Sequence, residues 1–343
     1  MQNIQTGTIG IVGAGGIGKA LHGRLLELGY SVLFTMNIDV TTLADGTTLP
    51  TEKNLALFLE LHPELRPQCI VISIPTVDTG ETALQIIEAA SALGITIVTC
   101  EKGALAYHAE KIIPKIKDGS LRIGYSASVG GGTHMLNYLA LRNPALRHTE
   151  IQAVVNGTCN FIFHQTAFGG RTLGEACSEA VRLGYAEPGA TEPLDIINGE
   201  LHDIRMKTCV LFNTILADSV YITPRDLGAL KLSESALEDI RRKSGQYRLV
   251  VTLSNAPSPQ PFEYTGAHFM TNVDGWNIQG GFRDTQKEPE LHTWLPPGVN
   301  NALHITEGKL GSGGRFLVSG PGAGHEPTTS AIMNDIKKYF GSK

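Results

Sequence analysis

Short runs of hydrophobic residues alternate with helical stretches through the first third of the chain. Continuous apolar or β-branched runs predict buried strands, and apolar residues spaced three and four apart predict amphipathic helices. Gly29 and Gly94 each follow a helical stretch, where a glycine commonly ends a helix. The predicted strands are Thr8–Val12, Ser31–Phe34, Cys69–Ile74, Ile95–Thr99 and Leu121–Tyr125, and the predicted helices are Ile17–Leu28, Glu81–Leu93 and 104–117. This alternation predicts an α/β fold with a doubly wound parallel sheet, covered by helices on both faces.

The pattern changes after about residue 135, where helical stretches are followed by strands. We therefore expect a first, Rossmann-type domain over 1–135 and a second, α+β domain over 136–317. A last helix, Pro327–Phe340, belongs to the segment 318–343, which we expect to pack back on the first domain. The second domain's predicted helices are 134–142, 158–168, 172–183 and 196–217, and its strands are Ile151–Val155, Arg248–Ser254, Phe262–Phe269 and Trp276–Gly281.

The composition narrows the class of protein. The 343 residues include 28 Lys and Arg against 33 Asp and Glu, and the resulting net charge of −5 argues against a non-specific nucleic-acid binder. No apolar run approaches the ~18 residues of a membrane span, and the N-terminus lacks the basic start of a signal peptide. Five scattered cysteines without a C-x-x-C spacing predict reduced, mostly buried thiols in a cytoplasmic protein, and neither disulfides nor a zinc site.

A glycine-rich segment, Gly13–Gly18, has the spacing G-x-G-x-x-G between the first predicted strand and the first predicted helix. In that context the motif predicts dinucleotide binding. Gly13 permits the tight turn, Gly15 lets the backbone approach a diphosphate, and Gly18 allows the helix to pack close to the sheet. Gly16 and Ile17 begin the helix, whose free N–H groups favour phosphate. The alternative is a glycine-rich turn that binds nothing.

The choice between NAD and NADP depends on the end of the second strand. A carboxylate that reads the ribose is expected about 20 residues after the glycines, and Asp39 lies near that distance. No Arg or Lys follows closely to pair with a 2′-phosphate. The sequence therefore favours NAD over NADP.

Polar residues follow two further strands of the predicted sheet, at the carboxyl ends where ligands bind in this fold. Pro75 and Thr76 follow the third strand, and Lys102 follows the next. Lys102 is either an exposed loop lysine or a group that carries a proton or holds a substrate oxygen.

Asp203 and Lys207 stand four residues apart on a predicted helix and therefore share one face. One interpretation is a surface salt bridge worth under about 1 kcal/mol. The other is a partly buried pair able to transfer protons, because their helical neighbours are apolar. Cys159 and Cys209 lack a basic partner in any recognisable motif, which favours core packing over a nucleophilic thiol.

Taken in chain order, these motifs resemble those of homoserine dehydrogenases, and the likeness covers nearly the whole chain. Each motif alone is weak, but the ordered set is specific. Besides Gly13–Gly18, Glu101-Lys102 and the helix with Asp203 and Lys207, the similar segments are Tyr125–Gly132, Asn156–Asn160, Gly184–Pro188, Gly298–Ala302 and Gly320–Gly324 followed by Pro327-Thr328.

The resemblance implies NAD(P)-dependent interconversion of L-homoserine and L-aspartate 4-semialdehyde, a step towards threonine and methionine. It implies that Lys102 and Lys207 are proton carriers and that Asp203 orients Lys207. It also implies a homodimer or homotetramer acting on a small amino acid. The implied substrate contacts are Glu187, Gly157, Thr158 and Tyr185, and the implied cofactor contacts are Gly13, Gly15, Gly16, Ile17, Gly18, Pro75, Thr76, Lys102 and Gly322.

Three departures from the family pattern bear on the substrate. Ser126 replaces a glutamate that binds a monovalent cation in the family, which leaves the backbone oxygens of Val129 and Gly131 as candidate ligands. Thr133-His134 replaces the usual Ile-Pro, and the stretch 188–202 is longer than usual. These departures leave two alternatives: a dehydrogenase of the same fold for another small hydroxy acid or amino aldehyde, and a catalytically silent nucleotide-binding sensor.

Overall fold

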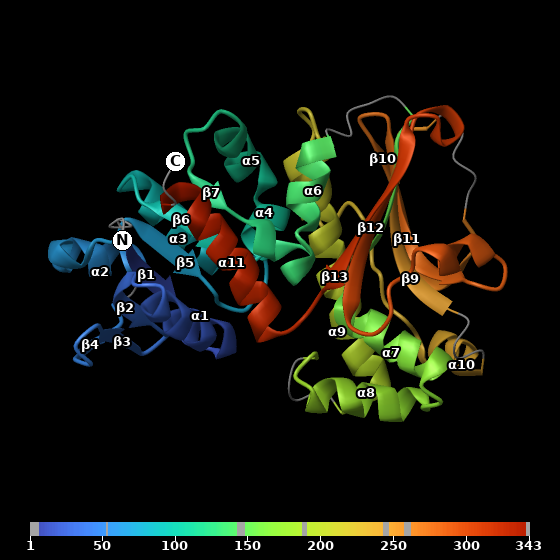
Figure 1. Cartoon of the computed structure of the whole chain (residues 1–343), viewed down its shortest axis with the longest axis horizontal. Helices are drawn as coiled ribbons and strands as arrows, with labels where there is room; N and C mark the ends of the chain where they lie inside the picture. Colours follow the sequence, from blue (N-terminus) through green and yellow to red (C-terminus); the bar gives the residue numbers. More distant parts are fainter. Residues whose placement is uncertain are drawn as a thin grey trace. The chain divides into compact units, whose positions relative to one another are not determined.

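A computed structural model describes residues 7–52, 54–142, 148–186, 191–242, 247–256 and 262–340. The chain divides into two compact units (Figure 1). The first unit comprises residues 1–128 and 325–343, and the second unit comprises 129–324. The sequence analysis places the corresponding boundaries near 135 and 318. Each unit is described by itself.

The first unit is built on a seven-stranded sheet with the order β4-β3-β2-β1-β5-β6-β7. β1 pairs in parallel with β2 and with β5, and the parallel pairing continues through β6 to β7. The predicted α/β class with a parallel sheet is thus confirmed. The strands are β1 (Thr8–Val12), β2 (Ser31–Met36), β3 (Val40–Leu43), β4 (Thr48–Pro50), β5 (Cys69–Ile72), β6 (Thr96–Thr99) and β7 (Ile123–Gly124).

The hairpin of β3 and β4 extends the sheet in antiparallel fashion beyond β2, and the sequence analysis did not predict it. Both strands are short and mostly exposed or partly exposed, so they lack the continuous apolar run that marks the buried strands. The helix α2 that follows was also missed. The segment that joins β4 to α2 and the start of α2 line the cavity described below, through Thr51, Glu52, Asn54, Leu55 and Ala56.

Helices cover the sheet of the first unit. Leu21 and Leu25 of α1 pack in one core with Ile332 and Ile336 of α11, and Figure 1 shows these helices side by side. The predicted helix 104–117 is two helices, because His108 leaves the helical conformation with φ −118° and ψ 32°. The helices are α1 (Gly16–Glu27), α2 (Leu55–Leu61), α3 (Glu81–Ala92), α4 (Gly103–Tyr107), α5 (Ala109–Lys117) and α11 (His325–Phe340), with short 3-10 turns at Pro63–Leu65 and Ser126–Ser128.

The second unit is built on a six-stranded antiparallel sheet with the order β10-β11-β9-β8-β12-β13. Every residue of β9 is buried. The sequence analysis found four of these strands and missed β12 and β13. The strands are β8 (Glu150–Val154), β9 (Tyr247–Ser254), β10 (Tyr264–Val273), β11 (Trp276–Asp284), β12 (Asn300–Glu307) and β13 (Gly314–Pro321).

The helices of the second unit include the long α9 (Pro193–Leu211), which starts on a proline at its first turn. The predicted helix 196–217 is α9 followed by a π-helical turn, Phe212–Leu216. No helix in the described part of the chain is long and apolar enough to cross a membrane. The remaining helices are α6 (Met135–Arg142), α7 (Gly157–Phe168), α8 (Leu173–Arg182) and α10 (Glu234–Arg242), with 3-10 turns at Gly131–Thr133, Pro289–Thr293 and Lys309–Gly311.

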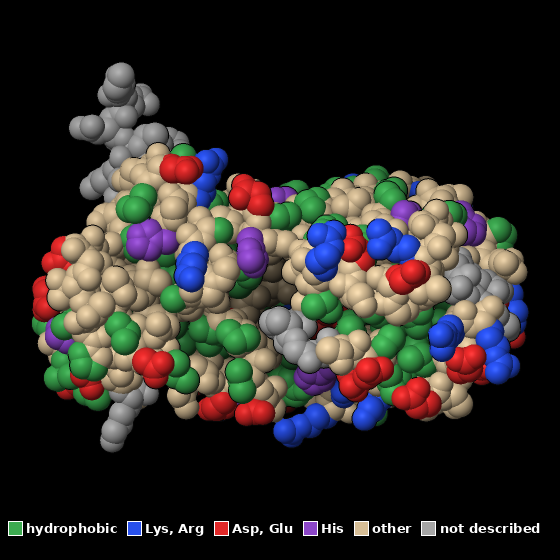
Figure 2. Space-filling model, turned by 90° about the horizontal axis from the view of Figure 1, so that it is seen from below, with side chains coloured by type: hydrophobic (Ala, Val, Ile, Leu, Met, Phe, Trp, Pro, Cys, Tyr) green, Lys and Arg blue, Asp and Glu red, His purple; other side chains and the backbone are tan. Residues whose placement is uncertain are grey.

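Charged side chains are spread over the surface. On the face drawn in Figure 2, Lys and Arg are interspersed with Asp and Glu, and neither sign gathers into a broad patch.

Candidate functional site

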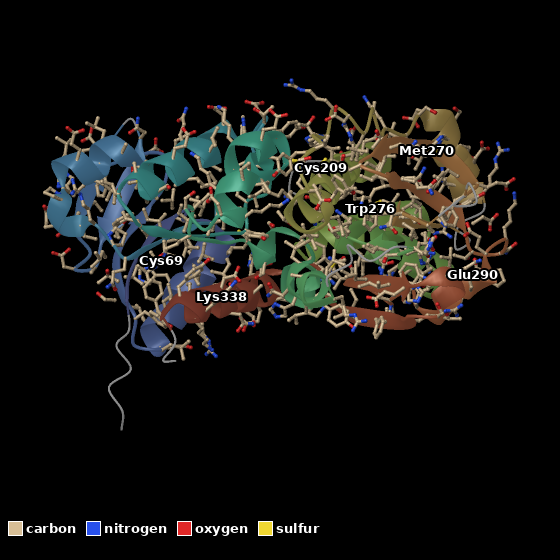
Figure 3. The ribbon with its side chains drawn as sticks, turned by 90° about the horizontal axis from the view of Figure 1, so that it is seen from above. Cys69, Cys209, Met270, Trp276, Glu290 and Lys338 are labelled. Carbon is tan, nitrogen blue, oxygen red and sulfur yellow. The ribbon has the colours of Figure 1, made fainter. Side chains whose placement is uncertain are left out.

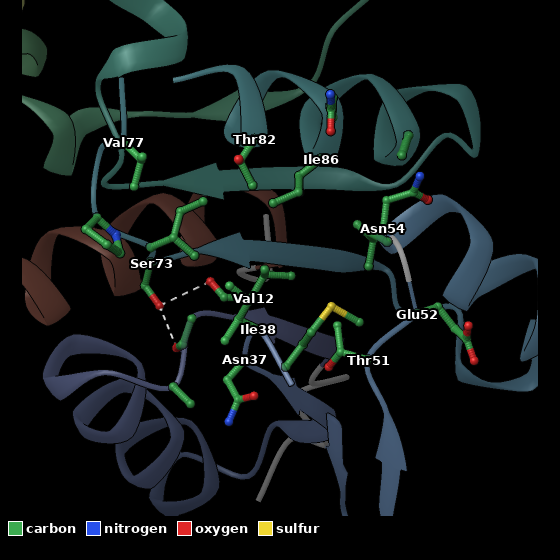
Figure 4. A pocket seen from close by; sticks show the side chains of 18 of the residues that line it. Val12, Asn37, Ile38, Thr51, Glu52, Asn54, Ser73, Val77, Thr82 and Ile86 are labelled. Carbon is green, nitrogen blue, oxygen red and sulfur yellow. Dashed lines mark hydrogen bonds between the residues drawn. The ribbon is translucent and has the colours of Figure 1, made fainter. Parts of the chain in front are cut away.

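A cavity of about 660 Å³ opens in the first unit at the carboxyl ends of β1, β2 and β5. This is the edge at which doubly wound sheets bind ligands. In Figure 4, Thr82 and Ile86 project from α3 on one side of the cavity, and Asn37 and Ile38 lie on the opposite side. The volume is within the usual range of small-molecule and cofactor sites.

The glycines of the β1–α1 turn are required for different steric reasons. A Cβ on Gly13, whose φ is +117°, would lie 2.5 Å from the backbone oxygen of Ser73. A Cβ on Gly18 would lie 1.8 Å from the backbone oxygen of Gly13. A Cβ on Gly15 would meet no atom within 4 Å, so the backbone at Gly15 faces open space.

Ser73 fixes the β1–α1 turn, and the N-terminus of α1 remains accessible to an anion. The hydroxyl of Ser73 donates hydrogen bonds to the backbone oxygens of Val12 and Gly13, as Figure 4 shows. α1 has no side-chain cap and no acidic residue in its first turn. Its N–H groups and positive helix end are therefore available to a phosphate next to Gly15.

The end of β2 differs from the expectation based on Asp39. β2 ends at Met36, and the residue that follows is Asn37 rather than a carboxylate. The side-chain oxygen of Asn37 accepts hydrogen bonds from the backbone N–H groups of Asp39 and Val40, so it is used within the turn. Ile38 lines the cavity and is 90% exposed, whereas Asp39 is not among the residues that line it.

Glu101 connects the loops that follow β5 and β6. Its buried carboxylate accepts hydrogen bonds from the hydroxyl of Thr76 and from the backbone N–H groups of Gly103 and Ala104, at 2.5, 2.5 and 3.1 Å. These bonds fix the start of α4, where Lys102 is the N-terminal capping position. Lys102 is thus held at the carboxyl edge of the sheet and is partly exposed.

A polar cluster lies in the second unit, where α7 begins and α9 passes. Nζ of Lys207 lies 2.7 Å from Oδ2 of Asp203, and their side chains are only 14% and 17% exposed. Nδ2 of Asn156 donates to Oδ2 of Asp203 at 3.1 Å and to Oε2 of Glu200 at 2.6 Å. The interpretation of Asp203 and Lys207 as an exposed surface pair is therefore wrong.

Asn156 also joins this cluster to the start of α7. Its Oδ1 accepts from the N–H of Cys159 and caps the helix. The neighbouring hydroxyl of Thr158 donates to the backbone oxygen of Tyr185 at 2.7 Å. A Cβ on Gly157 would lie 2.3 Å from the backbone oxygen of Val299, which explains the need for glycine there.

Comparisons with known proteins agree with this geometry. A model of the homoserine dehydrogenase family matches residues 135–336. Homoserine dehydrogenase of Sulfurisphaera tokodaii is 30% identical over 336 residues, which cover 95% of this chain and 96% of that protein. The chain belongs to the homoserine dehydrogenase family.

Other members of the family differ in length, and one of them is named for its cofactor. An NAD(+)-dependent homoserine dehydrogenase of Pseudomonas canavaninivorans is 29% identical over 266 residues, which cover 75% of this chain and 66% of that enzyme. The chain spans about half the length of the relatives from Corynebacterium glutamicum and Pseudomonas aeruginosa, with 52% and 50% covered.

Solved structures support the fold. The structure of a hyperthermophilic archaeal homoserine dehydrogenase in complex with NADPH aligns with a TM-score of 0.67 at 22% identity, covering 97% of each chain. Homoserine dehydrogenase from Thermoplasma acidophilum aligns with a TM-score of 0.68 at 20% identity, covering 98% of this chain and 99% of that one. The fold is that of the NAD(P)-dependent homoserine dehydrogenases.

Within this family frame, the implied substrate residues Gly157, Thr158 and Tyr185 lie together in the second unit. Gly322, an implied cofactor residue, also belongs to the second unit, where its carbonyl carbon would be 3.3 Å from a Cβ on Gly157. Glu187 lies outside the described residues. The implied cofactor residues of the first unit divide into Gly13, Gly15 and Pro75, which line the cavity, and Gly16, Ile17, Gly18, Thr76 and Lys102, which do not.

The structure adds two site residues that the sequence analysis did not assign. Asn156 was noted only as part of a motif, and Glu200 was not considered. The spacing of three residues from Glu200 to Asp203 on one helix was the available signal, since such residues share a face.

The candidate cation site has less support. Val129 and Gly131 are buried, and Gly131 has φ +52°. Ser126 has no carboxylate to neutralise a cation, and no group of three metal-binding side chains occurs in the described ranges. Binding of a monovalent cation stays a prediction, and no chemical step below depends on it.

The thiols are packing groups. Cys159 and Cys209 are 1% and 0% exposed, and Figure 3 shows Cys209 within the second unit and Cys69 within the first. Burial raises the pKa of Cys159 well above its usual value, and the nearby carboxylates of Glu200 and Asp203 raise it further. A thiol so strongly held in its neutral form is a poor nucleophile.

Proposed function

We propose that this chain interconverts L-homoserine and L-aspartate 4-semialdehyde, with NAD as the hydride acceptor in the oxidative direction. The observation that carries the proposal is the mostly buried Lys207–Asp203 pair, joined through Asn156 to the start of α7 in a chain of this family. A sensor would have no use for a proton carrier held in this way.

The first unit fits a dinucleotide. The cavity of about 660 Å³ includes Gly15, where the backbone faces open space, and it lies beside the free N-terminus of α1. When bound, a nicotinamide dinucleotide supplies the carbon that exchanges a hydride with the substrate.

The protein's own task is to control the proton. As the C–H bond of the alcohol carbon of homoserine loses its hydride, the O–H bond must lose a proton, and the C–O bond becomes the aldehyde double bond. The amine of Lys207 accepts that proton and returns it in the reductive direction. Asp203 holds Nζ of Lys207 at 2.7 Å and thereby limits its rotamers, and Lys102 is the second proton carrier.

The substrate is proposed to bind beside Lys207 and Asp203, near the start of α7. Thr158 and Tyr185 are the proposed contacts to the substrate, and the Thr158 hydroxyl donates a hydrogen bond to the Tyr185 backbone oxygen. Gly157 permits the close backbone packing that brings Thr158 into place. Glu187 is the proposed partner of the substrate ammonium group.

Two features of the cavity support NAD over NADP. Among the described residues that line it, Glu52 and Glu88 are acidic and none is Lys or Arg, which favours a cofactor without a 2′-phosphate. Ile38 offers an apolar side chain where a cationic partner of a 2′-phosphate would be needed.

The decisive experiment follows reduced-nicotinamide absorbance with purified protein, L-homoserine and either NAD or NADP. We expect turnover with homoserine and a higher kcat/KM for NAD. Cofactor binding with turnover only on another small hydroxy acid would replace the proposed substrate. Binding without turnover on any member of a hydroxy-acid panel would indicate a sensor.

We further infer a homodimer or homotetramer, a cytoplasmic location and a role in threonine and methionine biosynthesis. The five free cysteines fit a reducing compartment. Light scattering coupled to size exclusion tests the assembly, which should be two or four times the 36.8 kDa chain.

A further inference from the structure

His325 occupies the space above one glycine of the dinucleotide turn. A Cβ on Gly16 would lie 2.3 Å from Cε1 and 2.4 Å from Nε2 of His325. The adjacent Gly15 has no such neighbour and lines the cavity. The imidazole therefore covers Gly16 and stops short of the open backbone at Gly15.

The position of His325 is fixed by two helices of the first unit. His325 is the first residue of α11, and Gly16 is the first residue of α1. The two helices share a core that includes Leu21, Leu25 and Ile332. The ring consequently lies beside the N-terminus of α1, where the positive helix end and the N–H groups without a side-chain cap favour an anion.

The chemistry of the ring suits that place. His325 is exposed, and no hydrogen bond to its side chain is present among the described residues. A side chain needed only to fill space over Gly16 would require no polar nitrogen. An imidazole N–H is instead a donor, and donors to a charged oxygen make the stronger class of hydrogen bond.

We propose that His325 donates a hydrogen bond to the diphosphate of the bound dinucleotide. This inference rests on the proposed function, because it takes the cavity of the first unit to be the cofactor site. It assigns to one side chain of α11 a contact that the glycine turn itself makes only through backbone N–H groups.

The test compares His325→Gln, which keeps a side-chain donor, with His325→Leu, which fills similar space without one. Titration calorimetry measures binding of ADP-ribose, which contains the diphosphate, and of adenosine, which does not. We expect His325→Leu to bind ADP-ribose about tenfold more weakly than the wild type, and His325→Gln to recover part of the loss. Adenosine binding should be unchanged in both.

The matched control is Glu326→Gln, which changes the neighbouring residue in the first turn of α11. It should change the affinity for ADP-ribose by less than about twofold. Equal ADP-ribose affinity in the wild type, His325→Leu and His325→Gln would overturn the role of His325 while leaving the cofactor site intact. A wild type that binds neither NAD nor ADP-ribose would instead overturn the proposed function. Equal loss for ADP-ribose and adenosine would also contradict a specific diphosphate contact.

Discussion

Lys207 is the side chain on which the proposed chemistry depends most directly. Replacing Lys207 with Ala removes the proton carrier, and we expect kcat to fall by at least about a hundredfold. The dinucleotide cavity belongs to the first unit, so the affinity for NAD should stay nearly unchanged. Steady-state kinetics and a binding titration measure the two quantities.

The matched control for Lys207 is Lys231, an exposed lysine of the same unit. Lys231→Ala should leave kcat and KM within about twofold of the wild type. If Lys207→Ala kept near wild-type turnover with NAD binding intact, the proton would have to pass through another group.

Ile38 is the side chain that we expect to affect the choice of cofactor. It is 90% exposed, so Ile38→Arg introduces a cation with little cost to the fold. A guanidinium at this edge of the cavity should attract the 2′-phosphate and raise kcat/KM for NADP by about tenfold or more. Ile38→Gln introduces a polar side chain without a charge, and it should leave the ratio of NAD to NADP activity close to that of the wild type. An unchanged ratio in the Arg variant would place the adenosine ribose elsewhere.

Gly15 and Gly18 should separate binding from folding. Gly15→Ala meets no atom within 4 Å, so the melting temperature should hold while NAD binding weakens, because the new methyl group occupies the approach of the diphosphate. Gly18→Ala would lie 1.8 Å from the backbone oxygen of Gly13, so it should lower the melting temperature of the protein. Loss of stability in Gly15→Ala comparable to that in Gly18→Ala would contradict the separate roles.

Elements that are buried and regular could be predicted from the sequence, and elements with mostly exposed residues could not. β1 was predicted with the bounds that it has, because Thr8–Val12 is rich in β-branched residues and four of its five residues are buried in the sheet. The edge strand β13 was missed because its residues alternate between partly buried and exposed, and the three glycine or proline residues at its ends leave only a short hydrophobic run. The break between two helices at His108 could not be predicted either, because the periodic hydrophobic pattern continues across residues 104–117.

The residues of the candidate site could also be predicted only in part, but for a different reason. Asp203 and Lys207 could be paired from their spacing, since both are on one helix. Asn156 bridges Asp203 and Glu200 from another element, 47 and 44 residues away in the sequence, and no local pattern reports such a contact.

The start of α8 carries a local stability prediction. The hydroxyl of Thr172 accepts from the N–H of Glu175, and the carboxylate of Glu175 accepts from the N–H of Thr172, which forms a capping box. Thr172→Ala should lower the free energy of unfolding by about 1 kcal/mol in urea denaturation. Gly174→Ala, in the same turn and with open space around it, should raise that free energy by about 0.5–1 kcal/mol.

The capping box also has a pH dependence. Hydrogen bonds from Thr172 lower the pKa of Glu175 in the folded chain. A carboxylate whose pKa is lower in the folded chain stabilises the fold at pH values above its ordinary pKa of about 4.3. This contribution is lost as the pH falls through the pKa of the folded state. The difference between wild type and Thr172→Ala should therefore be full at pH 7 and shrink in acid. A difference that grows in acid would contradict the assignment.

At the scale of the whole molecule, the two units predict a divided response to cofactor. A ligand bound only by the folded first unit should stabilise that unit by about 2.7 kcal/mol at a concentration of 100 Kd. Hydrogen exchange with and without NAD measures where this stabilisation appears. We expect slower exchange in α1, α3 and the β1–α1 turn, which surround or border the cavity, and little change in β9 and β11, whose residues belong to the other unit. The variant Gly15→Ala serves as the control, because it should keep its exchange pattern when NAD is added. Protection that rose first in β9 and β11 would show that NAD binds to the second unit, and the cavity at the carboxyl ends of β1, β2 and β5 would then lose its assignment as the dinucleotide site.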